Sequence, residues 1–140
     1  MTELLSLLKH CGDWPVLPEV YVTSSTVWRQ KLLEKGRVYV VGECNRHNPF
    51  RLIYVACRAL WFAVKERPDV VISTGSAPIA FVCLFTRLLG GKIVWIDSVA
   101  QFEGLSVSSQ IMRHVADLCL CQWPEVAARY DDVEYVGQLL

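Results

Sequence analysis

The residues best suited to chemistry form a short polar turn that directly follows the β-branched run V-V-I. They are Ser73, Thr74, Gly75, Ser76 and Pro78. A turn between a strand and a helix presents hydroxyl groups and free helix N–H groups to a ligand, above all to an anion. With one glycine and no lysine, this turn matches neither a P-loop nor a dinucleotide-binding fingerprint. It either contributes to a ligand site or simply joins the strand to the helix.

Two further polar groups follow the next apolar runs of the chain. Asp97, Ser98 and Gln101 come after K-I-V-W-I, and Gln122 and Trp123 come after L-C-L-C. Because ligands bind at the carboxyl ends of parallel strands, we expect all three groups to lie at one sheet edge. Asp97 is predicted either to orient a sugar hydroxyl or to cap its turn. Trp123 either stacks on a sugar ring or closes the core, and we favour the core.

Nucleophilic and metal chemistry find little support in the sequence. The three histidines, His10, His47 and His114, are scattered and form no triad-like order with serine or cysteine, so no catalytic residue is assigned. The six cysteines contain no C-x-x-C pair, and we expect no metal site. They are predicted to be reduced, small, buried side chains, and Cys119 and Cys121 are too constrained on one strand to bridge.

Short apolar runs alternate with helical patterns along the whole chain. Strands are expected at 20–23, 38–41, 70–73, 92–97, 118–122 and 134–136. Helices are expected at 3–10, 27–35, 50–67, 79–89, 108–115 and 125–130, with Gly36 closing the second of them. Strands separated by helices imply right-handed β-α-β units and a parallel sheet. We therefore predict one α/β domain over residues 1–140, a Rossmann-like doubly wound parallel sheet.

One element of that fold is missing from the pattern. Domains of this kind usually begin with a strand, which lies in mid-sheet and leads into the first helix. Here the first helical pattern begins beside Met1. Either the first strand is missing from this chain, which would then be short at its N-terminus, or another segment takes its position.

Composition excludes several classes of protein. The 140 residues suffice for one domain with a real core, and a hydrophobic content of 53% excludes general disorder. Fourteen basic and fourteen acidic residues balance, so no nucleic-acid partner is expected. No run reaches the ~18 to 20 apolar residues that span a bilayer, which leaves contact with a membrane surface open.

The long helix at 50–67 has an unusual composition. Arg51, Arg58 and Lys65 recur every seven residues and fall on one stripe, between stretches that are apolar nearly all round. It is either a core helix with one solvated edge or an interfacial helix whose cations reach anionic lipid. Three such cations contribute only ~3 kcal/mol, so membrane contact would also need Trp61, Phe62 or another segment.

Four blocks of the chain, taken in this order, resemble one family. They are R-P-D-V-V-I-S-T-G-S-A-P at 67–78, W-I-D-S-V-A-Q at 95–101, A-D-L-C-L-C-Q-W-P-E at 116–125 and Y-V-G-Q-L at 135–139. The family is the oligosaccharide-biosynthesis family that contains the membrane-anchoring subunit of the split UDP-N-acetylglucosamine transferase of N-glycan precursor synthesis. Similar bacterial subunits serve exopolysaccharide and capsule glycosyltransferases.

The resemblance implies the N-terminal, acceptor-side half of a GT-B glycosyltransferase. It implies that no cofactor binds to this chain alone, because the UDP-sugar donor is held by a separate donor-side subunit. The pair is expected to act on a polyprenyl- or dolichyl-linked acceptor at the cytoplasmic face of the plasma or ER membrane. This chain is then a peripheral subunit that is active only with its partner, and its three polar turns bind the acceptor or face the partner.

Two departures from the family lead to an alternative. The strand and the Gly-rich, His-containing turn that normally precede the first helix are not in this chain. Where the family shows Glu-Ser-x-x-Arg, this chain has Asp97, Ser98 and Gln101, so the cation is lost. The alternative is a truncated, non-catalytic relative that acts as a binding or scaffold protein. A stand-alone nucleotide-sugar enzyme is a third hypothesis.

Overall fold

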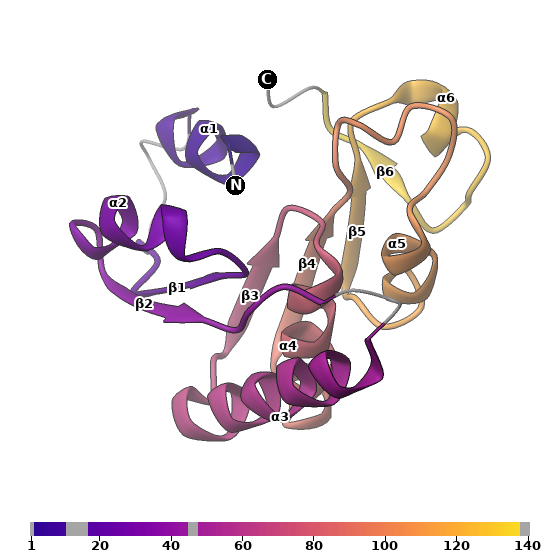
Figure 1. Cartoon of the computed structure of the whole chain (residues 1–140). Helices are drawn as coiled ribbons and strands as arrows, with labels where there is room; N and C mark the ends of the chain where they lie inside the picture. The colour runs from indigo at the N-terminus through magenta and orange to yellow at the C-terminus, as the bar shows by residue number, and fades with distance from the viewer. Residues whose placement is uncertain (1, 11–16, 45–47, 138–140) are drawn as a thin grey trace.

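The computed structural model describes residues 2–10, 17–44 and 48–137 (Figure 1). Its strands are β1 (Val20–Thr23), β2 (Arg37–Val40), β3 (Val70–Ser73), β4 (Lys92–Ile96), β5 (Leu118–Cys121) and β6 (Glu134–Tyr135). Its helices are α1 (Thr2–His10), the 3₁₀ turn η1 (Thr26–Trp28), α2 (Arg29–Leu33), α3 (Pro49–Glu66), α4 (Ala77–Leu88), α5 (Val107–Met112) and α6 (Pro124–Ala127). Cys11, His47 and the end of the fourth sequence block lie outside the described residues.

All strand pairings are parallel, as the alternation of strands and helices predicts. β3, β4, β5 and β6 form one sheet in that order, and β1 pairs with β2 in a second sheet. In a Rossmann-type sheet, the first strand of the chain lies in mid-sheet, between the second and the fourth. Among the described residues that position, between β1 and β3, holds no strand. The prediction of a Rossmann-like parallel sheet is confirmed.

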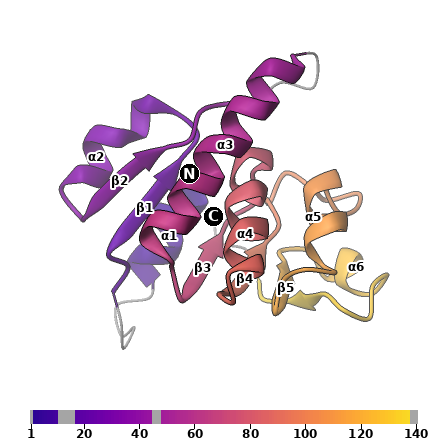
Figure 2. The ribbon, with the colours of Figure 1, turned by 90° about the horizontal axis from the view of Figure 1, so that it is seen from below.

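Helices cover the strands in layers. α2 and α3 lie on opposite sides of β1 and β2 in Figure 1, as a doubly wound fold requires. Figure 2 shows α3, α4 and α5 in a row, and α4 contacts β3, β4 and both neighbouring helices. This row of helices runs past both sheets and connects them.

The core has two parts, and α4 contributes to each. The first surrounds Trp95 of β4, which is fully buried between β5 and the helices α4, α5 and α6. The second, which we call the bridging cluster, consists of Val41, Ala59, Phe62 and Val82. Partly buried side chains of β1, β2 and α4 pack against it, so it connects the smaller sheet to the rest of the molecule.

Local sequence signals explain where the helices begin and end. The Asn48 side chain caps α3 by accepting a hydrogen bond from the Arg51 backbone N–H at 3.2 Å, and Pro49 takes the first helical position. α3 ends at Glu66, and its C-cap residue Arg67 directly precedes Pro68, so the helix stops before the proline as predicted. Arg67 itself has a left-handed φ of 43°.

The expected helix at 27–35 is different in detail. It starts as a 3₁₀ turn, in which the Ser25 hydroxyl accepts from the Val27 N–H at 3.5 Å, and becomes α-helical only from Arg29. Gly36 follows the helix, yet it does not adopt the left-handed conformation expected of a C-terminal glycine. A side chain there would begin 2.7 Å from the Glu19 carbonyl oxygen, so close backbone approach is what requires glycine.

Candidate functional site

The three polar turns meet at the carboxyl edge of the larger sheet, as predicted. Gly75, with a φ of 69°, lies so close to the next turn that a Cβ would sit 3.1 Å from the Ser98 nitrogen and 3.2 Å from the Ile96 oxygen. The Gln122 side-chain amide donates to the Asp97 carbonyl oxygen at 3.0 Å. The turns after β3, β4 and β5 are thus in contact, in that order.

Asp97 acts inside the fold. The residue is only 2% exposed, and its carboxylate accepts three hydrogen bonds. The donors are the Ser98 N–H at 3.0 Å, the Ser106 N–H at 3.2 Å and the Ser106 hydroxyl at 3.1 Å. Ser106 in turn caps α5 by accepting from the Ser109 N–H at 3.1 Å. The geometry therefore favours the capping interpretation of Asp97 over direct contact with a sugar hydroxyl.

A second buried carboxylate, which the sequence did not indicate, holds the same turn from the other side. Glu3 is 7% exposed, and its Oε1 accepts from the Val99 N–H at 2.8 Å and the Ser98 hydroxyl at 3.1 Å. These bonds dock the first turn of α1 onto the carboxyl end of β4. A glutamate in the first turn of a helix is an ordinary sequence feature, so nothing nearby in the chain pointed to this contact.

Trp123 closes the core and also lines a surface pocket. Its indole N–H donates to the Val99 carbonyl oxygen at 2.7 Å, and its ring meets Phe102 edge-on at a centroid distance of 6.5 Å. The half-buried ring packs against the core around Trp95, in line with the interpretation we favoured. A shallow pocket of 390 Å³ opens beside it, lined by Phe102, Glu103, Trp123, Glu125 and Arg129. Of these five residues, the sequence pattern indicates only Trp123 as a site residue.

The predicted site residues differ in what they can touch. Ser73, Pro78, Asp97 and Gln122 are buried, so their side chains support the turns and offer no contact surface. The Ser73 hydroxyl has no hydrogen-bond partner among the described residues. Those that reach the surface, fully or in part, are Thr74, Gly75, Ser76, Ser98, Gln101 and Trp123.

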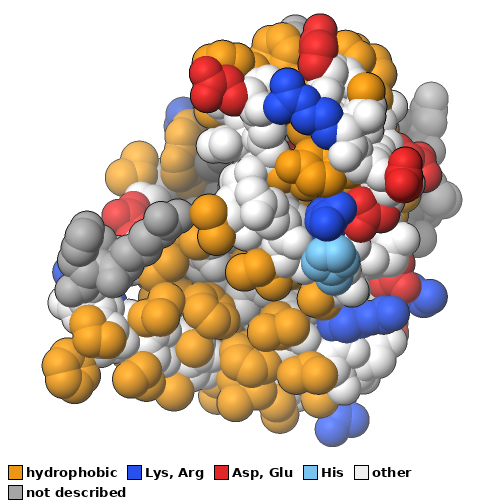
Figure 3. Space-filling model, turned by 90° about the vertical axis from the view of Figure 1, so that its right-hand side faces the viewer, with side chains coloured by type: hydrophobic (Ala, Val, Ile, Leu, Met, Phe, Trp, Pro, Cys, Tyr) orange, Lys and Arg blue, Asp and Glu red, His pale blue; other side chains and the backbone are white. Residues whose placement is uncertain are grey.

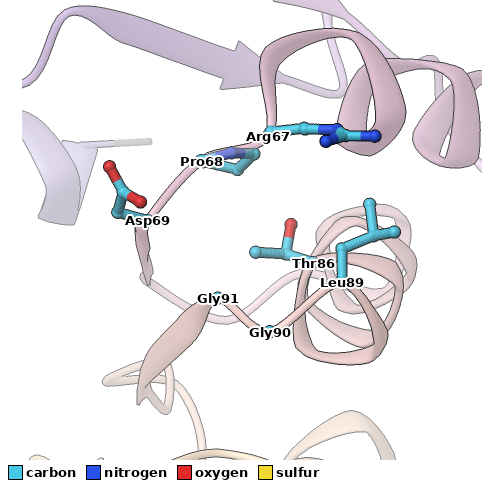
Figure 4. A pocket seen from close by; sticks show the side chains of 7 residues that line it. All are labelled: Arg67, Pro68, Asp69, Thr86, Leu89, Gly90 and Gly91. Carbon is cyan, nitrogen blue, oxygen red and sulfur yellow. The ribbon is translucent and has the colours of Figure 1, made fainter.

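A second pocket lies away from these turns, near the amino ends of β3 and β4. It has a volume of 220 Å³ and is lined by Arg67, Pro68, Asp69, Thr86, Leu89, Gly90 and Gly91 (Figure 4). The Thr86 side chain points into it, and its buried hydroxyl has no partner among the described residues. This pocket is not part of the sheet edge that the polar turns form.

The outer face of α3 is apolar and exposed. Figure 3 shows apolar side chains gathered over the lower part of the molecule, and those of α3 are Phe50, Leu52, Ile53, Tyr54, Leu60, Trp61 and Val64. We call these seven residues the α3 face. Trp61 is 53% exposed, in agreement with its predicted surface position. Phe62 is 3% exposed and belongs to the bridging cluster, so the prediction that it contacts a membrane is wrong.

The basic stripe predicted for α3 lies beside this face. Lys65 Nζ is 4.6 Å from the centre of the Trp61 ring, and Arg58 donates to the Tyr54 hydroxyl at 2.7 Å. Both cations, like Arg51, belong to exposed residues. The stripe and the α3 face together form one amphipathic surface.

The described cysteines are all free, but they are not all buried. Burial raises the pKa of Cys83 and of Cys119 to about 12, so neither supplies a thiolate at neutral pH. Cys57, on α3, is exposed, which corrects the expectation of uniformly buried thiols.

Comparison with known proteins agrees with this geometry. A family model described as "Oligosaccharide biosynthesis protein Alg14 like" matches residues 22–139. The chain belongs to this family. The predicted resemblance is thereby confirmed, and it includes all three polar turns.

Curated relatives carry the name UDP-N-acetylglucosamine transferase subunit ALG14. The relative from Yarrowia lipolytica is 32% identical over 162 aligned positions, which cover 99% of this chain and 75% of the relative. The mouse relative is 30% identical over 98 positions, 63% of this chain and 45% of the relative. The Schizosaccharomyces pombe relative is 37% identical over 75 positions, 50% of this chain and 36% of the relative. The match thus spans less than half of the mouse and fission-yeast proteins.

Among solved structures, MurG of Acinetobacter baumannii has a similar fold. The TM-score is 0.73 at 14% sequence identity, over 96% of this chain and 40% of MurG. At this identity the likeness concerns the fold alone. It confirms the prediction of a Rossmann-like half of a GT-B structure.

Proposed function

We propose that this chain is the acceptor-side, membrane-associated subunit of a two-component glycosyltransferase that makes lipid-linked oligosaccharide or polysaccharide. The family match supports a role in oligosaccharide biosynthesis, and the relatives are named as subunits of a UDP-N-acetylglucosamine transferase. The observation that carries the proposal is the sheet edge. Three polar turns meet there on a single GT-B-like half, and none has the glycines and lysine of a nucleotide-binding loop.

In this proposal the exposed part of the edge binds the acceptor. Hydroxyl groups of Thr74 and Ser76 and the Gln101 amide would form hydrogen bonds with sugar or phosphate oxygens. The Trp123 pocket adds an aromatic ring and carboxylates, a combination that suits a sugar, which has an apolar face and a ring of hydroxyls. Asp97 and Glu3 fix the turn after β4 without touching the acceptor.

The nucleotide sugar would bind to a separate donor-side subunit that closes over the same edge. The acceptor is then held between the two chains, so neither chain alone contains a complete site. No catalytic residue is assigned to this chain, since its two buried carboxylates at the edge are engaged with backbone and serine donors.

The α3 face and its basic stripe would hold the subunit on the cytoplasmic face of the membrane. None of the helices in the described residues is long and apolar enough to cross a bilayer. The exposed apolar side chains would enter the headgroup region, each removing apolar area from water at roughly 25 cal/mol per Å². Arg51, Arg58 and Lys65 would add about 1 kcal/mol each on an anionic surface.

The experiment is reconstitution of sugar transfer. We expect this chain to co-purify with a small donor-side subunit, and the mixture to transfer N-acetylglucosamine from UDP-N-acetylglucosamine to a polyprenyl-linked acceptor. Each chain alone should be inactive. Transfer by this chain alone would contradict the proposal and favour a stand-alone enzyme.

A second candidate function has its own support. Gln101 stands where the family motif has an arginine. This difference favours a non-catalytic relative that binds the partner or the lipid as a scaffold. In the same reconstitution, a stable complex without any transfer would support this second function over the first.

A further inference from the structure

The pocket beside Thr86 has no role in the proposed function. We call it the Thr86 pocket; its seven lining residues belong to the loop before β3, the end of α4 and the loop before β4 (Figure 4). The two loops are joined to each other, because the Lys92 N–H donates to the Asp69 carbonyl oxygen at 2.8 Å. The pocket therefore lies at the paired starts of β3 and β4, on the side of the helices.

Thr86 supplies the first sign that this pocket takes a ligand. The residue is 1% exposed, its side chain points into the pocket, and its Oγ1 has no hydrogen-bond partner among the described residues. A buried hydroxyl of this kind destabilises a fold, because it loses its hydrogen bonds to water without replacement. A polar molecule in the pocket would supply the partner.

Arg67 gives the pocket a cation that is not engaged elsewhere. Two neighbouring cations, Arg87 and Lys92, form ion pairs with Asp117 at 3.1 and 3.3 Å. Within the described part of the chain, Arg67 forms no ion pair. In Figure 4 its side chain extends on the Thr86 side of the pocket. A free guanidinium suits a phosphate or a carboxylate, which it binds with two parallel hydrogen bonds.

The backbone conformation of Arg67 is unfavourable for an arginine. Its φ of 43° lies in the left-handed region, directly after the last residue of α3. Glycine is the usual residue in this conformation after a helix, because it has no Cβ. A long charged side chain is thus present where the backbone favours none, which agrees with a binding role for it.

Asp69 adds a carboxylate to the same pocket. Figure 4 shows Asp69 and Arg67 on opposite sides of Pro68, and no ion pair joins Asp69 to any described cation. The C-terminal ends of α3 and α4, which carry partial negative charge, also meet at this pocket. The pocket therefore favours a positive group as well as a negative one.

We propose that the Thr86 pocket binds a small zwitterion, in which a phosphate or carboxylate is joined by a short chain to a primary ammonium. The anionic group pairs with Arg67 and accepts a hydrogen bond from the Thr86 hydroxyl, and the ammonium pairs with Asp69. An anion alone would meet the repulsion of Asp69, and a cation alone would meet that of Arg67.

The size of the pocket agrees with such a ligand. Its 220 Å³ equal about seven times the volume of a water molecule, which is room for a molecule of a few carbon atoms and one phosphate. The inference goes beyond the proposed glycosyltransferase function and does not depend on it.

A titration of the full 140-residue chain tests the inference, with O-phosphoethanolamine as the probe and NMR as the readout. We expect saturable shifts of the Gly90 and Gly91 amide signals. The affinity should exceed that for inorganic phosphate and for ethylamine by about tenfold or more, because each of these lacks one of the two charges. Glycerophosphoethanolamine, a copy of a lipid headgroup, identifies the source: equal binding indicates a membrane lipid, and weaker binding indicates a free metabolite.

Three substitutions separate binding from folding. Thr86→Val removes the hydroxyl but keeps the shape, so it should weaken phosphoethanolamine binding about fivefold without lowering the melting temperature. Arg67→Gln should weaken binding about tenfold or more, whereas Arg29→Gln, an exposed control on α2, should leave it unchanged. Asp69→Asn should weaken the binding of phosphoethanolamine and strengthen that of inorganic phosphate, because it removes a repulsive carboxylate.

Other results would overturn the inference. One is the absence of saturable shifts with phosphoethanolamine, which would leave a water molecule as the partner of the Thr86 hydroxyl. Another is equal affinity for inorganic phosphate and phosphoethanolamine, which would identify a site for anions only. A third is wild-type affinity in Thr86→Val, or signal shifts confined to residues outside the two loops.

Discussion

At the scale of single residues, the sheet edge separates side chains that build the turns from side chains that reach solvent. Asp97 and Glu3 hold the turn after β4 from opposite sides through bonds to backbone and serine donors. Thr74, Ser76 and Gln101 remain available to a ligand. Substitutions in the two groups should therefore have different effects, the first on stability and the second on binding.

Replacing Asp97 should test its structural role. Asp97→Asn keeps one acceptor oxygen but turns an NH₂ group toward donors, so we expect the free energy of unfolding to fall by about 1–3 kcal/mol. Asp131→Asn, at an exposed position, should leave it unchanged. Urea denaturation measures both. If Asp97→Asn is as stable as the wild type but binds the acceptor more weakly, Asp97 contacts the ligand directly.

Ser73 offers the opposite case, because its buried hydroxyl lacks a described partner. Ser73→Ala should leave the unfolding free energy unchanged or raise it by up to about 1 kcal/mol. Ser106→Ala should lower it by about 1–2 kcal/mol, since that hydroxyl caps α5 and bonds to Asp97. If both variants lose the same stability in chemical denaturation, the Ser73 hydroxyl has a partner in solution.

At the scale of elements, α3 combines a buried face, an apolar exposed face and a basic stripe. Its sequence is apolar nearly all round, so the pattern alone could not separate exposed Trp61 from buried Phe62. The Tyr39 ring of β2 meets both side chains edge-on. The distinction comes from the tertiary packing: Phe62 is buried in the bridging cluster with Val82 of α4, whereas Trp61 lies beside Lys65 at the surface.

The basic stripe should govern binding to anionic vesicles. Arg51→Gln, Arg58→Gln and Lys65→Gln should each weaken binding about fivefold, equivalent to about 1 kcal/mol per cation. Lys31→Gln is the matched control, because Lys31 lies on α2 on the other side of β1 and β2. Vesicle co-sedimentation measures the effect, which should vanish on neutral lipid. If all four variants lose the same vesicle affinity, binding depends on the net charge of the protein rather than on the cations beside the α3 face.

Asp117 ties α4 and β4 to the start of β5 and should contribute to acid sensitivity. The Ile93 backbone N–H, at 2.9 Å, is the main cause that lowers the pKa of its carboxyl, and Lys92 and Arg87 assist. A lowered folded-state pKa gives stability that is present above the unfolded pKa of about 4 and is lost as pH falls through the folded value.

Asp117→Asn should therefore lower the free energy of unfolding most at neutral pH and progressively less as the solution becomes acidic. The stability gap between wild type and variant, measured by denaturation at a series of pH values, should narrow below about pH 4. Asp132→Asn is the comparison, because Asp132 is exposed and forms an ion pair with Arg113. A gap that stays constant with pH would mean that the charge of Asp117 does not matter.

Much of the element pattern could be predicted because buried parallel strands have continuous apolar sequences. V-V-I and K-I-V-W-I appear as β3 and β4, and the three polar turns meet where strand topology requires. Contacts between segments that lie far apart in the sequence could not be predicted. Glu3 binds the turn at Ser98 and Val99, a pairing that no local pattern encodes. The Trp123 pocket likewise needs Phe102 and Arg129 from separate segments.

At the scale of the whole molecule, one row of helices packs against both sheets and connects them. The bridging cluster is the apolar connection between them, so it should control how independently the smaller sheet opens. Phe62→Ala should lower the free energy of unfolding by about 3–5 kcal/mol. The backbone amides of Arg37 and Val41 should then exchange earlier than those of Lys92 and Asp97, as followed by native-state hydrogen exchange.

Phe50→Ala provides the control for this substitution, since Phe50 is exposed on the same helix. It should leave exchange in both sheets unchanged. If hydrogen exchange in Phe62→Ala becomes faster to the same extent at Arg37, Val41, Lys92 and Asp97, the two sheets unfold as one cooperative unit.

The exposed thiol of Cys57 lies on α3 one helical turn from Ile53 and one turn from Trp61, within the apolar surface itself. Cys83 and Cys119 are buried with a raised pKa and will react slowly. A water-soluble alkylating reagent should therefore reach Cys57 in the free chain and lose access once a bilayer or a partner covers α3. The native sequence thus carries, at the centre of its most unusual surface, a chemical reporter of whether that surface is occupied.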